Sequence, residues 1–169
     1  MYYTIGDKFP EFSCEAVDID STLIDIEYLQ EDMWSVVYFY PKDFTFICPT
    51  EIADMDRLLG DADVLGFSPD NAHCKLAWKE QNALIRSIQH PLCHDGGNEL
   101  ARELGIYDAK EGVPYRATYI IDPEGVIQHY SVNALDTGRN AEEVLRTLNA
   151  LQSGGLTGCS WQPGDDFVA

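Results

Sequence analysis

The chain has 169 residues, of which 45% are hydrophobic and 11% aromatic, a composition typical of one globular domain with a substantial core. Its 29 acidic and 11 basic side chains give a formal net charge of −18, which argues against nucleic acid and anionic membranes as partners, because both are bound through clusters of Lys and Arg. Five irregularly spaced cysteines do not form a secreted disulfide framework, and no leader or membrane-spanning run is visible, so we expect a cytoplasmic protein.

Apolar periodicity predicts that strands and helices alternate along the chain. The run at 34–40 is apolar, β-branched and aromatic, as in a buried strand, and DVLGFS at 63–68 predicts another. Asn140, followed by two glutamates, is a favourable N-cap for a last helix. In chain order the predicted elements are a strand (34–40), a helix (49–59), a strand (63–68), a helix (72–88), a short strand (91–94), a helix (98–104), a hairpin within YRATYIIDPEGVIQHYSV and a helix from Asn140.

This order predicts an α/β fold, namely a thioredoxin-like sandwich in which a mixed β-sheet is flanked by helices. We assign residues 1–152 to this domain. Residues 153–169 are predicted to be a flexible C-terminal tail, because three glycines lie within its first six residues.

Cys48 lies at the predicted start of the helix over 49–59. Pro49 suits the first helical position, since its missing N–H would have no intrahelical partner, so Cys48 is the predicted N-cap and Glu51 the third helical residue. Unpaired N–H groups and the helix dipole at such an end stabilise a thiolate, the nucleophilic form of cysteine. Most free cysteines are instead small buried core residues, and spacing alone leaves both interpretations open.

A long and specific motif surrounds this cysteine. Pro41, Thr45 and Cys48 occur in the order Pro-x-x-x-Thr-x-x-Cys, and FTFICPTE resembles the active-site motif of the peroxiredoxins, in particular of the two-cysteine, alkyl hydroperoxide reductase C (AhpC) type. The resemblance extends from TIGDKFPEF to the tail. It implies that Cys48 is the peroxidatic cysteine, that Thr45 hydrogen-bonds the peroxide and that Pro41 shields the pocket.

Two arginines fall on positions where the same family has arginines. When a thiolate attacks a peroxide, the departing oxygen gains negative charge, and hydrogen-bond donors around it lower the barrier. The resemblance implies that Arg116, in YRATYIID, holds thiolate and peroxide, and that Arg139, in GRNAEEVLR, pairs with Glu51. The alternative for either arginine is a surface ion pair of small energetic value.

The tail contains a second cysteine of interest, Cys159. Gly154, Gly155 and Gly158 give this segment the freedom to carry a thiol to a partner, and Cys159 resembles the resolving cysteine of the family. One residue separates it from Trp161, whereas two or more do so in much of the family, so the match is to a subgroup. The alternative is an idle surface thiol.

The remaining cysteines, Cys14, Cys74 and Cys93, match no family cysteine and are interpreted as small packing residues. His90, Cys93, His94 and Asp95 resemble a cluster of metal ligands. Only alternate residues of a strand share a face, however, which separates Cys93 from the two histidines, and we expect no metal site.

Together the resemblance implies a thiol peroxidase that reduces hydrogen peroxide or alkyl hydroperoxides and needs no metal, haem or flavin. Cys48 would become a sulfenic acid and then form a disulfide with Cys159 of the neighbouring subunit. A dithiol protein, such as thioredoxin, a flavoprotein disulfide reductase or an alkylhydroperoxidase-type adapter, would restore the thiols, and the family forms homodimers that often assemble into decameric rings. The alternative is a peroxide sensor or holdase-like binding protein on the same fold.

Overall fold

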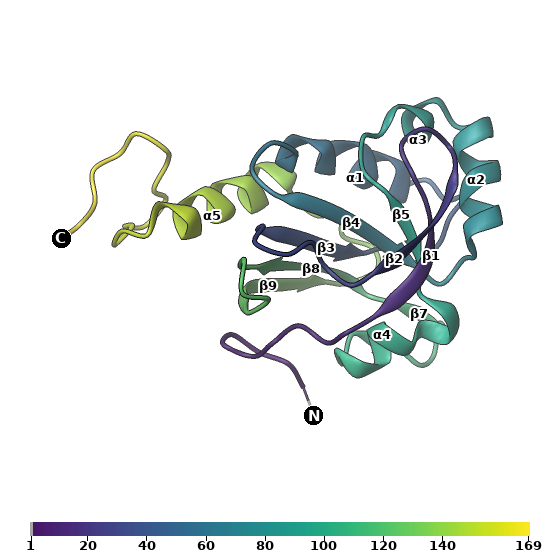
Figure 1. Ribbon diagram of the computed structural model, residues 1–169, viewed down its shortest axis with the longest axis horizontal. Helices are drawn as coiled ribbons and strands as arrows, with labels where there is room; N and C mark the ends of the chain where they lie inside the picture. The colour runs from purple at the N-terminus through teal and green to yellow at the C-terminus, as the bar shows by residue number, and fades with distance from the viewer. Residues whose placement is uncertain (1) are drawn as a thin grey trace.

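A seven-stranded mixed sheet lies at the centre of the computed structural model, which describes residues 2–169 (Figure 1). Its strand order is β2-β1-β5-β4-β3-β8-β9. β4 is parallel to β3 and to β5, and the other neighbours are antiparallel. These strands are β1 (Ser13–Val17), β2 (Leu23–Glu27), β3 (Ser35–Phe39), β4 (Asp63–Ser68), β5 (Leu92–His94), β8 (Arg116–Ile121) and β9 (Ile127–Asn133), and a separate small ladder joins β6 (Tyr107–Asp108) to β7 (Val113–Pro114).

Helices cover both faces of this sheet, which confirms the predicted architecture (Figure 1). They are α1 (Cys48–Asp54), η1 (Met55–Leu58), α2 (Ala72–Gln81), α3 (Ala83–Ser87), η2 (Gly96–Asn98), α4 (Glu99–Glu103) and α5 (Ala141–Ser153). α5 begins after Asn140 as expected, and the Asn140 side chain accepts a hydrogen bond from the backbone N–H of Glu143. No helix within residues 2–169 is long and apolar enough to cross a membrane.

The sheet separates two apolar cores, because successive side chains of a strand point to opposite faces. Val36 and Tyr38 of β3 belong to the core beneath α1, α2 and α5, which also contains Cys48. Val37 and Phe39 belong to the other core, which packs against α4 and contains Cys93. β3 is fully buried on both faces, as its continuous apolar run predicts.

The predicted helix over 72–88 is wrong in one respect, since the chain forms two helices that meet at Asn82. Asn82 has extended backbone angles, and its side chain accepts hydrogen bonds from the N–H groups of Leu84 and Ile85. A short polar side chain that caps a new helix in this way competes with continuation of the old one.

The hairpin of β1 and β2 was not among the predicted elements. Along most of each strand exposed residues alternate with more buried ones, and β2 is an edge strand, so neither shows the continuous apolar run that identifies a fully buried strand. The turn between them is held by the Asp20 side chain, which accepts from the N–H and hydroxyl of Thr22.

Candidate active site

Cys48 follows the loop that connects the carboxyl end of β3 to α1. Its side chain has no exposed surface. The predicted N-cap is wrong by one residue: Ile47 already has helical angles and is the N-cap, so Cys48 is the first helical residue and Pro49 the second. The Ile47 carbonyl accepts from the N–H groups of Thr50 and Glu51, which fixes this first turn. The thiol therefore still lies at the positive end of the helix.

Arg116 begins β8, next to β3, and points at the cysteine. Its Nη1 lies 3.3 Å from Cys48 Sγ and 2.6 Å from Glu51 Oε2, and its Nε donates to the Leu135 carbonyl at 2.7 Å. Burial opposes the charge of Arg116, but hydrogen bonds and charge from Cys48 and Glu51 outweigh it and raise the pKa of the arginine. A fixed cation thus lies in contact with the sulfur.

Glu51 connects the two arginines that the sequence singles out. Arg116 donates to its Oε2, while the backbone N–H and Nε of Arg139 donate to its Oε1 at 2.9 and 3.1 Å. The side chains of all three residues are at most 5% exposed. Because the carboxylate is shared, it holds both guanidinium groups in one arrangement.

Arg139 is held in turn by the sheet. Its Nη1 donates to the Ala117 carbonyl at 3.0 Å and to Thr118 Oγ1 at 3.1 Å, and its guanidinium lies 4.9 Å from the ring centre of Tyr38. Tyr38 is itself fixed, since its hydroxyl lies 2.6 Å from Nε2 of the buried His90.

His90 continues this chain of contacts to η1. Its Nδ1 lies 2.7 Å from Asp56 Oδ1, and Asp56 also accepts from the backbone N–H of Gln89. Both ring nitrogens of His90 are therefore occupied, and neither is free to bind a metal ion together with His94 or Cys93.

A pocket of about 390 Å³ opens beside this network. Pro41, Thr45 and Arg116 line it, whereas Cys48 is not one of the lining residues and is connected to the pocket through its contact with Arg116. Thr45 Oγ1 donates to the Lys42 carbonyl at 3.0 Å, which leaves the lone pairs of its oxygen able to accept a hydrogen bond. The pocket has room for a small molecule with one polar end.

Two residues that sequence reasoning missed anchor the loop before Cys48. Lys75 on α2 is fully buried, and its Nζ lies 3.3 Å from Asp43 Oδ1 and 3.1 Å from the Tyr40 hydroxyl. Asp43 also accepts from Ser68 Oγ at 2.8 Å, and its N–H donates to Asp70 Oδ2 at 2.8 Å. The only signal available was the position of Lys75 one turn before Trp78, on a face that periodicity would assign to apolar side chains.

Cys159 is exposed and does not join this cluster. The tail around it is packed on α5 through Trp161, which is 7% exposed, stacks on Phe167 and accepts a hydrogen bond from Arg146 through its carbonyl. α5 starts beside Glu51 and runs away from the sheet, so the tail lies at its far end (Figure 1). The flexibility of residues 153–169 stays a prediction.

The arrangement of a buried cysteine, an arginine and a shared glutamate can be compared with known proteins. The signature of the AhpC/TSA family matches residues 5–130. The chain belongs to the AhpC/TSA family. An alkyl hydroperoxide reductase C of Mycolicibacterium smegmatis is 40% identical to this peroxiredoxin over 98% of this chain and 93% of the relative, and a putative peroxiredoxin of Bacillus subtilis is 40% identical over 95% of each chain.

Solved structures give the same result for the fold. The reduced 2-Cys peroxiredoxin of Plasmodium vivax superposes with a TM-score of 0.89 at 32% identity, covering 96% of this chain and 91% of the other. An AhpC of Mycobacterium tuberculosis superposes with a TM-score of 0.81 at 36% identity, covering 90% and 99%. The thioredoxin-like fold and the relation to two-cysteine peroxiredoxins are confirmed, and the protein is a thiol-dependent peroxidase that acts on peroxides, rather than the alternative sensor or holdase.

Replacing Arg116 by alanine should slow the reaction of the enzyme with peroxide by at least about tenfold, equivalent to about 1.4 kcal/mol of transition-state stabilisation. The reason is that the donor nearest Cys48 Sγ is lost. Stopped-flow measurement of the peroxide reaction provides the test. Arg57→Ala is the matched control, because Arg57 is 52% exposed and pairs only with carboxylates at the surface. An unchanged rate in folded Arg116→Ala would assign Arg116 a structural role.

Proposed function

We propose that Cys48 is the peroxidatic cysteine of this thiol peroxidase. The observation that carries the proposal is the position of Sγ, 3.3 Å from Nη1 of Arg116, a residue that lines the pocket. A cation in this place stabilises the thiolate before the reaction and the departing oxygen during it. Glu51 and Arg139 then act as positioning residues that keep Arg116 in place.

In the first step the Cys48 thiolate attacks one oxygen of the peroxide and the O–O bond breaks. The sulfur keeps the attacked oxygen as a sulfenic acid, and the other oxygen leaves with a proton as water or an alcohol. Thr45 accepts a hydrogen bond from the peroxide OH, because its own proton is given to the Lys42 carbonyl. Pro41, on the pocket wall, limits the access of water.

In the second step Cys159 of a neighbouring subunit condenses with the sulfenic acid to form a disulfide and water. Cys159 is exposed, in a tail that packs on α5 through Trp161 and outside the site of its own chain, which favours an intersubunit bond. A homodimer is the minimum assembly for this step, and a decameric ring built from such dimers is proposed from the resemblance.

The buried thiol has to become accessible for this second step. The N-terminus of α1 is suited to local unwinding, because Ile47 makes no side-chain cap hydrogen bond and Phe46 beside it is 98% exposed. Unwinding of the first turn would bring Cys48 to the surface without moving the sheet.

A dithiol protein is proposed to reduce the disulfide and complete the cycle. Thioredoxin, a flavoprotein disulfide reductase and an alkylhydroperoxidase-type adapter all supply the required pair of thiols. A cytoplasmic location, which rests on the five free cysteines, stays a prediction.

The experiment that tests the proposed cycle uses Cys159→Ser. This variant should consume one equivalent of peroxide per subunit, because Cys48 is intact, but lose the peroxide-induced disulfide-linked dimer on a non-reducing gel. Cys74→Ser, which changes a half-buried thiol of α2 instead, should retain that dimer. A dimer that persists in Cys159→Ser would show that another cysteine resolves the sulfenic acid.

A further inference from the structure

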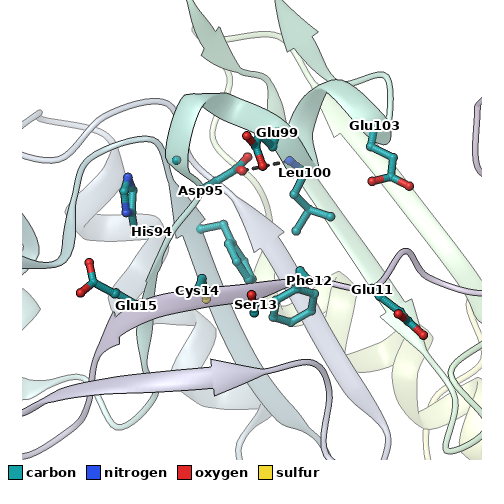
Figure 2. A pocket seen from close by; sticks show the side chains of 12 residues that line it. Glu11, Phe12, Ser13, Cys14, Glu15, His94, Asp95, Glu99, Leu100 and Glu103 are labelled. Atoms are coloured by element: carbon teal, nitrogen blue, oxygen red, sulfur yellow. Dashed lines mark hydrogen bonds between the residues drawn. The ribbon is translucent and has the colours of Figure 1, made fainter.

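A second cavity lies on the face of the sheet opposite Cys48. It has a volume of about 520 Å³ and opens between the start of β1 and the segment that follows β5 (Figure 2). Cys14 of β1 lines it, with Phe12 beside it and Asp95 and Leu100 on the opposite wall. Nothing in the peroxidase cycle uses this cavity.

The register of the sheet places a second cysteine behind Cys14. Ala16 lies directly opposite Cys93 in the antiparallel ladder of β1 and β5. Cys14 is two residues before Ala16, so it shares the same face and is the diagonal neighbour of Cys93. Cys93 has no exposed surface, whereas Cys14 is half-buried at the cavity wall.

The two thiols differ in their acidity. A hydrogen bond from the Cys93 thiol lowers the pKa of Cys14, outweighing burial and the negative charge of Asp95. Burial raises the pKa of Cys93 well above its usual value, so this thiol keeps its proton. The pair therefore consists of an accessible thiol whose pKa is lowered and a buried thiol that donates to it.

We propose that Cys14 and Cys93 form a second dithiol, separate from Cys48, in which a small neutral peroxide oxidises Cys14 and Cys93 then closes a disulfide with it. The oxidant is the substrate class of the enzyme itself. The pair is a modification site that responds to peroxide on the far side of the sheet from the peroxidase reaction.

The chemistry balances without any further reactant. The Cys14 thiolate attacks one peroxide oxygen, the O–O bond breaks, and the departing oxygen takes a proton from water, which leaves a sulfenic acid on Cys14. The sulfur of Cys93 then attacks the Cys14 sulfur, and its thiol proton leaves with the hydroxyl group as water. Two thiols are oxidised to a disulfide and one peroxide is reduced.

The strand can move enough to form this bond. Diagonal neighbours have Cα atoms roughly 7–8 Å apart, whereas disulfides usually need about 4.4–6.8 Å. Within residues 2–169 the ladder of β1 and β5 holds two register pairs, at Ala16 and Val17, so at Cys14 the backbone of β1 pairs with the edge strand β2 but not with β5. The Phe12 ring packs on Phe67 and anchors this end of β1, so the disulfide needs a local shift of Cys14 toward Cys93. The resulting bond is strained and easily reduced, as reversible disulfides are.

The charge of the cavity restricts the reagents that reach Cys14. Its rim carries five carboxylates, on Glu11, Glu15, Asp95, Glu99 and Glu103 (Figure 2). They repel anions such as glutathione or iodoacetate and leave access to neutral molecules such as hydrogen peroxide.

The first test measures labelling of the reduced wild-type protein by neutral iodoacetamide. Cys74 is the matched control within the same chain, because it is also half-buried but burial and the negative charge of Asp43 raise its pKa. Cys14 should react at least about tenfold faster than Cys74, because the rate of alkylation follows the fraction of thiolate. Anionic iodoacetate should lose this preference, and Glu15→Gln should restore part of it. Equal labelling of Cys14 and Cys74 by iodoacetamide would overturn the proposal.

The second test treats the full chain carrying Cys48→Ser and Cys159→Ser with hydrogen peroxide and identifies cross-linked peptides by mass spectrometry. A Cys14–Cys93 linked peptide is expected, and it should disappear on treatment with a reducing dithiol. In a further Cys93→Ala variant, which keeps the core apolar, Cys14 should be oxidised more slowly, because the hydrogen bond from Cys93 is lost, but should then remain as a sulfenic acid that dimedone traps. A Cys14 that stays reduced, or that is oxidised without linking to Cys93, would overturn the proposal.

Discussion

Cys48→Ser should lower peroxide turnover by about four orders of magnitude or more, because loss of a nucleophile is among the most damaging substitutions in an enzyme. A serine hydroxyl at this position would be fully buried beside the Arg116 guanidinium and would still be protonated at neutral pH. The fold should be kept, since oxygen replaces sulfur with little change of shape. Turnover measured with an excess of a recycling dithiol provides the test.

The matched control for this experiment is Cys74→Ser. Cys74 lies on α2, outside the network of Cys48, Glu51 and Arg116, so most of the turnover should remain. Activity retained by Cys48→Ser at the level of this control would contradict the assignment of Cys48 as the peroxidatic residue.

Glu51→Ala should destabilise the protein by about 3–5 kcal/mol, the cost of removing one member of a buried ionic network and leaving the others uncompensated. Both Arg116 and Arg139 would lose their shared carboxylate in a network whose three side chains are at most 5% exposed. Glu51→Gln keeps the shape and one hydrogen-bond acceptor, so it should cost less. Urea unfolding at a fixed protein concentration measures both effects, because assembly makes apparent stability depend on concentration.

Glu143→Ala is the control for charge removal at the surface. Glu143 pairs with Arg146 at 2.8 Å, but its side chain is 57% exposed, and such pairs contribute about 0–1 kcal/mol. If Glu51→Ala and Glu143→Ala lowered the free energy of unfolding equally, burial would not explain the contribution of the Glu51 network to stability.

The elements that the sequence predicts well are those in which a single physical signal dominates. β3 is a continuous apolar run in the centre of the sheet, and α5 has a strong cap at Asn140. The residues of the site motif also come together as expected, because β3, the following loop and α1 are local in the chain and β8 is the neighbour of β3.

Other features depend on contacts that no local pattern reveals. Lys75 is buried on a helix face where apolar residues are expected, and the distant Asp43, together with the Tyr40 and Ser68 hydroxyls, makes that burial tolerable. Asn82 ends α2 because its side chain caps α3, which periodicity alone does not register. The β1–β2 hairpin is half-exposed at one edge of the sheet, so its strands lack a distinctive apolar signal.

The contact of His90 with Asp56 fixes the C-terminal end of the helical segment that begins at Cys48. Asp56 belongs to η1, which continues α1, and its bonds to His90 and Gln89 hold that end against the core. The opposite end, at Ile47, is held by backbone hydrogen bonds but has no side-chain cap. In the proposed cycle, opening would be restricted to the turn that carries the sulfur, so Cys48 could be exposed and covered again while the hydrophobic core beneath this helical segment stays closed to water.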